Sequence, residues 1–107
     1  MDELPSNPTL GDLQRYIAAR CKERGWDKHS DIEKLMFLTE EVGEVAKEVR
    51  RMTGKHGYKR PENTDHLGEE LADVLNFVFD IANSNDIDLE KAFRAKWDTV
   101  ATRIWEA

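Results

Sequence analysis

Apolar residues recur along the middle of this chain at alternating intervals of three and four, which is the spacing of amphipathic helices. The first such run consists of Leu35, Leu38, Val42, Val45, Val49 and Met52. A second run with the same alternation consists of Leu67, Leu71, Val74, Val78 and Ile81. The pattern predicts two long helices, each with an apolar stripe along one side.

Residues typical of helix ends set the boundaries of the first two predicted helices. Thr9 with Asp12 three residues later predicts the start of one helix, and Gly25 predicts its end. Ser30 followed by Glu33 forms a capping box, which predicts the start of the next helix. The first helix therefore spans about residues 10–24, and the second begins just after Ser30.

Similar residues bound the other two helices. Gly54 is expected to end the second helix, Thr64 to begin the third, and the Asn83-Ser84-Asn85 stretch to end it. Asp88 is expected to cap a last helix, which carries Leu89, Phe93, Trp97, Val100 and Ile104 on one side. Four helices with short connections predict an all-α, four-helix bundle-like antiparallel fold. Residues 1–8 are expected to form a flexible arm, and residues 9–107 a single domain.

Composition adds an expectation about assembly and surroundings. The chain has 107 residues, of which 39% are hydrophobic and 36% charged. Because such a chain builds only a modest core, we expect it to complete its burial as a homodimer or homotetramer. The net charge of −6 argues against binding a nucleic acid polymer or an anionic membrane. The lone Cys21 suits a reducing, cytoplasmic environment, and no apolar run is long enough to span a membrane.

One acidic phrase occurs twice in the two striped segments. The first copy is Glu40-Glu41-Val42-Gly43-Glu44, and the second is Glu69-Glu70-Leu71-Ala72-Asp73. In each copy two carboxylates are three residues apart, so they share one side of a helix. If the two stripes pack together, four carboxylates converge, which is unfavourable unless cations lie between them.

The four carboxylates therefore predict a divalent-metal site made of Glu41, Glu44, Glu70 and Asp73. All four offer hard oxygen ligands, which favour Mg²⁺ or, as a substitute, Mn²⁺. Magnesium usually completes its shell with water and substrate phosphates, so the site suggests phosphate chemistry. The alternative is that both acidic flanks are ordinary solvated surfaces.

These residues resemble a known family over residues 10–105. The two carboxylate pairs look like those of the MazG-like, all-α nucleoside triphosphate pyrophosphohydrolases. Arg24-Gly25-Trp26 resembles the Trp-bearing segment of the dCTP pyrophosphatase-like branch, and Ile87 to Ala92 resembles the start of the last helix. The resemblance implies that Mg²⁺ held by the acid pairs engages a nucleoside triphosphate, which is hydrolysed to the monophosphate and pyrophosphate.

The resemblance also implies roles for four further residues. Lys96 and Arg103 would contact phosphate, although both also suit the solvated end of a helix. Trp26 would stack on the base, or else cover the end of the bundle. Glu40 would orient the attacking water as a general base, or else be a surface residue.

Substrate and function stay open at this point. A connection at about 54–63 is longer than in many members of the family, and its Lys55, His56, Lys59 and Arg60 form either a flap for a polyanionic ligand or a solvated loop. One alternative function is hydrolysis of phosphoribosyl-ATP by a related pyrophosphohydrolase. The other is a non-catalytic helical interaction module whose acidic flanks keep it soluble or contact a basic partner.

Overall fold

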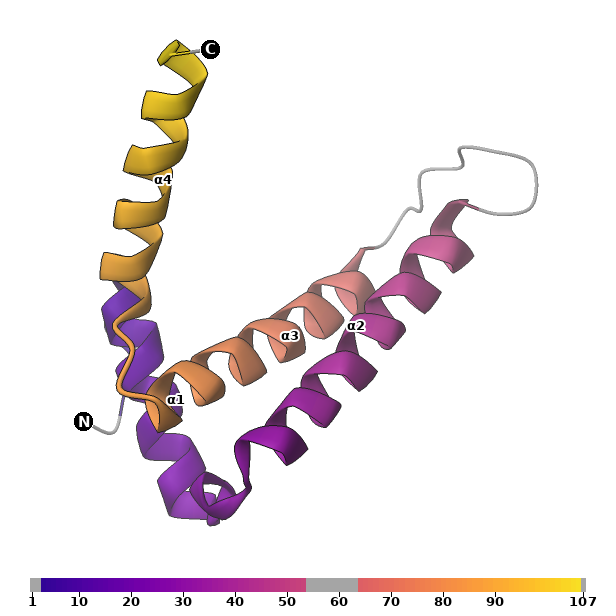
Figure 1. Cartoon of the computed structure of the whole chain (residues 1–107). Coiled ribbons are helices and arrows are strands. Elements are labelled where there is room, and N and C mark those ends of the chain that lie inside the picture. Colours follow the sequence, from indigo (N-terminus) through magenta and orange to yellow (C-terminus); the bar gives the residue numbers. More distant parts are fainter. Residues whose placement is uncertain (1–2, 54–63, 107) are drawn as a thin grey trace. The chain divides into compact units, whose positions relative to one another are not determined.

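The chain is all-α, as the sequence predicts. A computed structural model describes the backbone of residues 3–53 and 64–106 and the side chains up to residue 102. Four α-helices and one short 3-10 helix make up these described residues, which contain no β-strand (Figure 1). The elements are α1 (Leu10–Arg24), η1 (Trp26–Lys28), α2 (Asp31–Thr53), α3 (Asp65–Ser84) and α4 (Leu89–Glu106). The basic connection of 54–63 and the predicted stop at Gly54 lie outside the described residues.

The predicted caps explain where α1 and α2 begin and end. The Thr9 hydroxyl accepts a hydrogen bond from the Asp12 backbone N–H, and the Asp12 carboxylate accepts one from the Thr9 N–H. Ser30 and Glu33 make the same reciprocal pair at the start of α2. Gly25 ends α1 in the left-handed region with φ 75°, which a glycine adopts without the steric cost of a Cβ. The sequence did not predict η1, the short turn that follows Gly25.

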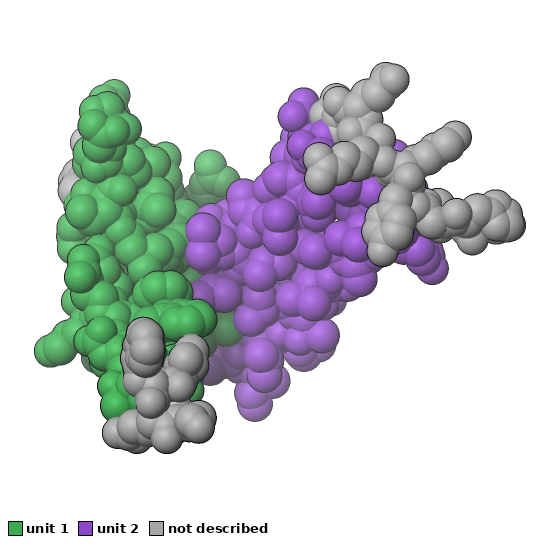
Figure 2. Space-filling model, turned by 90° about the horizontal axis from the view of Figure 1, so that it is seen from above, with its two compact units in different colours: residues 1–28, 79–107 green, residues 29–78 purple. Residues whose placement is uncertain are grey.

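Contacts divide the chain into two compact units, residues 1–28 with 79–107, and residues 29–78 (Figure 2). In the unit of residues 29–78, α2 and α3 run antiparallel. The rings of Phe37 and Phe77 lie 5.7 Å apart, and one turn further along each helix Glu41 and Asp73 approach one another. Each step of four residues forward along α2 is therefore matched by a step of four back along α3.

In the other unit, the buried Gln14 of α1 joins the end of α3 to the start of α4. Its amide nitrogen donates to the Asn83 side-chain oxygen at 3.0 Å and to the Ile87 carbonyl at 2.6 Å. Its amide oxygen accepts from the Leu89 backbone N–H at 3.0 Å. Both polar ends of this buried side chain are thus satisfied, which fixes the turn that leads into α4.

Few apolar side chains are fully buried. Among the described residues the buried apolar ones are Cys21, Phe79 and Ala82. The predicted stripe on α2 divides in two, because Leu38, Val45 and Met52 are half-buried whereas Leu35, Val42 and Val49 are exposed.

None of the described helices combines the length and the apolar character that crossing a membrane requires.

Candidate metal centre

Three of the four predicted ligands meet on facing sides of α2 and α3. Glu41 comes from α2, and Glu70 and Asp73, three residues apart, come from the same side of α3. One carboxylate oxygen from each of the three lies within 4.8 Å of the others. All three side chains are half-buried, so they are positioned by the helices and still open to a ligand.

The electrostatics of this cluster are unfavourable without a cation. Burial raises the pKa of Glu41, and a hydrogen bond with Glu70 and the negative charges of Asp73, Glu70 and Glu44 raise it further. Each of these causes disfavours the ionised form of Glu41. The cluster would gain stability from a bound positive charge.

Glu44 and Glu40 lie beside the cluster rather than in it. Both side chains are exposed on α2. The charge of Glu44 is close enough to raise the pKa of Glu41, but its oxygens do not belong to the group that converges within 4.8 Å. The metal-ligand role of Glu44 and the catalytic role of Glu40 therefore stay predictions.

An aromatic pair under the cluster was missed by the sequence analysis. Phe37 lies four residues before Glu41, and Phe77 four residues after Asp73, so each ring shares a side of its helix with a carboxylate. His29 packs edge-on against Phe37 at 5.3 Å between ring centroids. The four-residue spacing was the signal that could have found this pair, which separates α2 and α3 by a fixed, apolar layer.

The predicted nucleotide-binding residues belong to the other unit. Trp26 is exposed in η1, where the Arg24 guanidinium lies 5.0 Å from its ring centroid. Lys96 is exposed on α4. The side chain of Arg103 lies outside the described residues. The roles of these three residues in substrate binding stay predictions.

The donor set fits Mg²⁺ or Mn²⁺. Among the described residues, the ligand atoms available in the cluster are all carboxylate oxygens, with no histidine nitrogen or cysteine sulfur. Hard divalent cations prefer oxygen ligands, whereas zinc and copper sites use imidazole or thiolate. Three carboxylates would leave part of a magnesium shell for water and phosphate oxygens.

Comparison with known proteins places the chain in a family. Residues 29–104 match the MazG nucleotide pyrophosphohydrolase domain. The uncharacterized protein YpjD of Bacillus subtilis (strain 168) is 34% identical over 87 residues, which cover 81% of this chain and 78% of YpjD. The human protein dCTP pyrophosphatase 1 is 35% identical over 96 residues and 85% of this chain. This chain spans only about half of that longer relative, 56% of its length.

Solved structures show the same fold. A Bacillus-conserved MazG protein, described as a nucleotide pyrophosphohydrolase, aligns with a TM-score of 0.74 and 30% identity over 90% of this chain and 93% of that one. The putative pyrophosphatase YpjD from Bacillus subtilis aligns with a TM-score of 0.72 and 30% identity over 92% of this chain and 99% of that one. The family resemblance predicted from the repeated carboxylate pairs is thus confirmed, and the chain belongs to the MazG nucleotide pyrophosphohydrolase domain family.

Proposed function

We propose that the chain hydrolyses (deoxy)nucleoside triphosphates to the nucleoside monophosphate and pyrophosphate, in a reaction that depends on Mg²⁺. The observation that carries this proposal is the convergence of Glu41, Glu70 and Asp73 within 4.8 Å on two antiparallel helices. Such a cluster lowers the stability of the folded chain when no cation is bound. A nucleotide pyrophosphohydrolase can use a bound cation to neutralise the phosphates of its substrate. Removal of unwanted nucleotides from the cellular pool is the role that this reaction would serve.

Glu41, Glu70 and Asp73 would hold the metal, and Glu44, one helical turn after Glu41 on α2, would join them when its exposed side chain turns toward the cluster. Bound Mg²⁺ would offset the negative charge of the triphosphate and lower the pKa of a nearby water. The contribution of the chain is to hold the carboxylates in place, because α2 and α3 are fixed by the Phe37–Phe77 contact one turn away.

Three further residues would act on the nucleotide itself. Lys96 and Arg103 would contact phosphate oxygens, and Trp26 would stack on the base. Glu40 would accept a proton from the attacking water. Glu40 is exposed on α2, so its carboxylate is open to water.

The substrate that we propose to test first is dCTP, because several relatives are named dCTP pyrophosphatase 1. The protein would be incubated with each NTP and dNTP in the presence of Mg²⁺, and the products separated by ion-exchange chromatography. We expect a monophosphate and pyrophosphate in equal amounts. Orthophosphate as the primary product would contradict the reaction, since it would mean cleavage of the terminal phosphate.

The same panel separates the alternative functions. Turnover of phosphoribosyl-ATP in preference to every NTP and dNTP would identify a related pyrophosphohydrolase with a different substrate. A non-catalytic helical module would turn over none of these substrates. It would also show no rise in melting temperature with millimolar Mg²⁺, because it would hold no metal-binding carboxylates.

A further inference from the structure

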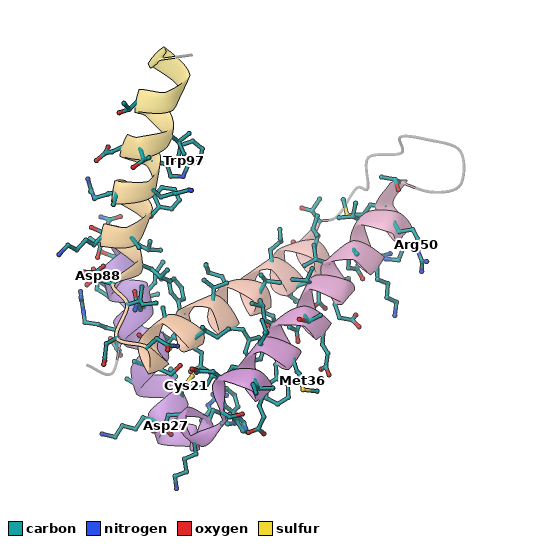
Figure 3. The ribbon with its side chains drawn as sticks, in the orientation of Figure 1. Cys21, Asp27, Met36, Arg50, Asp88 and Trp97 are labelled. Atoms are coloured by element: carbon teal, nitrogen blue, oxygen red, sulfur yellow. The ribbon has the colours of Figure 1, made fainter. Side chains whose placement is uncertain are left out.

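Arg24 and Trp26 lie against one another just where α1 ends. The Arg24 guanidinium carbon lies over the indole ring, 5.0 Å from its centroid. At this distance a cation is attracted to the face of an aromatic ring. Both residues belong to the compact unit that contains α1 and η1, and in Figure 3 their turn lies between the labelled Cys21 and Asp27. The contact is therefore formed within one unit of the chain.

Gly25 brings these two side chains together. On a continuous helix, residues two apart lie about 200° around the axis from one another, so Arg24 and Trp26 would point to nearly opposite sides. Gly25 instead turns the chain with φ 75°, and its N–H group donates to the Lys22 carbonyl at 3.2 Å. This left-handed turn returns the indole to the Arg24 side chain.

The Arg24 guanidinium has no carboxylate partner among the described residues. Three other arginines, Arg15, Arg20 and Arg51, each pair with a carboxylate three residues away on the same helix, at 2.6–3.1 Å. In the described part of the chain Arg24 makes no such ion pair, and its guanidinium lies on the indole instead. Because no carboxylate competes for this cation, Arg24 and Trp26 hold one another in place.

The indole of Trp26 still has surface to offer to a ligand. Trp26 is 46% exposed although the guanidinium lies over its ring. An aromatic ring has two faces, and a cation over one face leaves the other open to a flat ligand such as a nucleobase. Stacking on an indole that is already held in one orientation loses less conformational entropy than stacking on a mobile one.

We propose that Arg24 is a positioning residue for nucleotide binding, which holds Trp26 in the orientation in which its open face stacks on the base. Arg24 acts through the indole and not on the phosphates. This inference rests on the proposed function, because it takes Trp26 to be the residue that binds the base. The competing explanation is that Arg24 serves only as a cation at the carboxyl end of α1, a role that Lys22 in the same last turn fills equally well.

Steady-state kinetics test this role with dCTP, or with whichever NTP or dNTP the substrate panel shows to be hydrolysed fastest. Arg24→Gln should raise the KM about threefold to tenfold and leave kcat unchanged, because the indole must then be ordered when the base binds. Arg24→Lys keeps a cation but loses the planar group, so its KM should lie between these two values. Lys22→Gln is the matched control, since it removes one positive charge from the same turn of α1 at an exposed position. It should behave as the native protein.

Inorganic tripolyphosphate, which has no base, separates an effect on the indole from a contact with phosphate. Its inhibition constant, measured with Mg²⁺ against the same nucleotide, should be equal in the native protein and in Arg24→Gln. An inhibition constant that rises as much as the KM would mean that Arg24 binds phosphate, and would overturn the proposal.

A double-mutant cycle tests whether Arg24 acts through Trp26. In the Trp26→Leu variant, Arg24→Gln should cause no further rise in KM, since the ring that it positions is gone. An equal rise in both backgrounds would assign Arg24 to the helix end and overturn the proposal. A native chain that hydrolyses nucleotides with the same KM as Arg24→Gln would overturn this inference alone. A native chain that hydrolyses no nucleoside triphosphate would overturn the proposed function, and this inference with it.

Discussion

Replacing Glu70 by Gln should stabilise the metal-free protein and weaken its response to Mg²⁺. Gln keeps the size of the side chain, removes one negative charge from the cluster, and can donate its amide N–H to Glu41. At the 4.8 Å limit that joins these oxygens, two unit charges repel by about 0.9 kcal/mol in water and about 3.5 kcal/mol at an effective dielectric constant of 20. Because the carboxylates are half-buried and screened by salt, we expect Glu70→Gln to gain about 1–2 kcal/mol in EDTA.

Thermal unfolding followed by circular dichroism measures this gain. For a chain of this size, 1 kcal/mol corresponds to a Tm change of about 4–8 °C. With millimolar Mg²⁺ the native protein should become more stable, since binding to the folded state adds to its unfolding free energy. The variant should gain much less, so that the order of the two melting temperatures reverses when EDTA is replaced by Mg²⁺. Hydrolysis of nucleoside triphosphates by the variant should fall by orders of magnitude.

Glu69→Gln is the matched control. It makes the same chemical change at the neighbouring position of α3, where the side chain is 73% exposed and lies 3.7 Å from His66 instead of in the cluster. This variant should behave as the native protein in EDTA, in Mg²⁺ and in the activity assay. The reasoning fails if Glu70→Gln is no more stable than Glu69→Gln in EDTA, or if its response to Mg²⁺ is fully preserved.

Three further predictions follow from the described residues. Gln14→Leu should lower the unfolding free energy by about 2–4 kcal/mol in denaturant titrations. The reason is that the substitution leaves the polar groups bonded to Gln14, among them the Leu89 N–H, without their partner. An unchanged midpoint of the denaturant transition would mean that water replaces the amide. Gly25→Ala should lower the unfolding free energy by about 1 kcal/mol, because a residue with a Cβ is strained at φ 75° even though the Cβ would meet nothing within 4 Å. A melting temperature equal to that of the native protein would contradict this. Because the pKa of Glu41 is raised above its ordinary 4.5 in the folded state, the stability it confers is present below pH 4.5 and lost as the pH rises through the raised value. The stability of Glu41→Gln relative to the native protein in EDTA should therefore increase between pH 4 and neutrality, and a difference that is constant or decreases would refute the cause assigned to the shift.

Helix ends are the part of the fold that local sequence predicted best. Thr9 with Asp12, and Ser30 with Glu33, satisfy backbone groups only a few residues away, so their geometry does not depend on the rest of the chain. Gly25 ends α1 for an equally local reason. The repeated carboxylate pairs likewise depend on helical spacing alone, which is why Glu70 and Asp73 could be placed on one side of α3 from the sequence.

Which side of each helix faces its neighbour was decided only by the tertiary structure. α2 is apolar around much of its circumference. The sequence therefore offers two equally good sets of residues for contact with α3, namely Leu38, Val45 and Met52, or Leu35, Val42 and Val49. The packing of Phe37 against Phe77 turns the first set and Glu41 toward α3, and leaves the second set exposed. It also separates Glu41 from Glu44, which the sequence treats alike. Periodicity fixes angles within one helix, but the rotation of a helix about its own axis is set by long-range packing, which no local pattern contains.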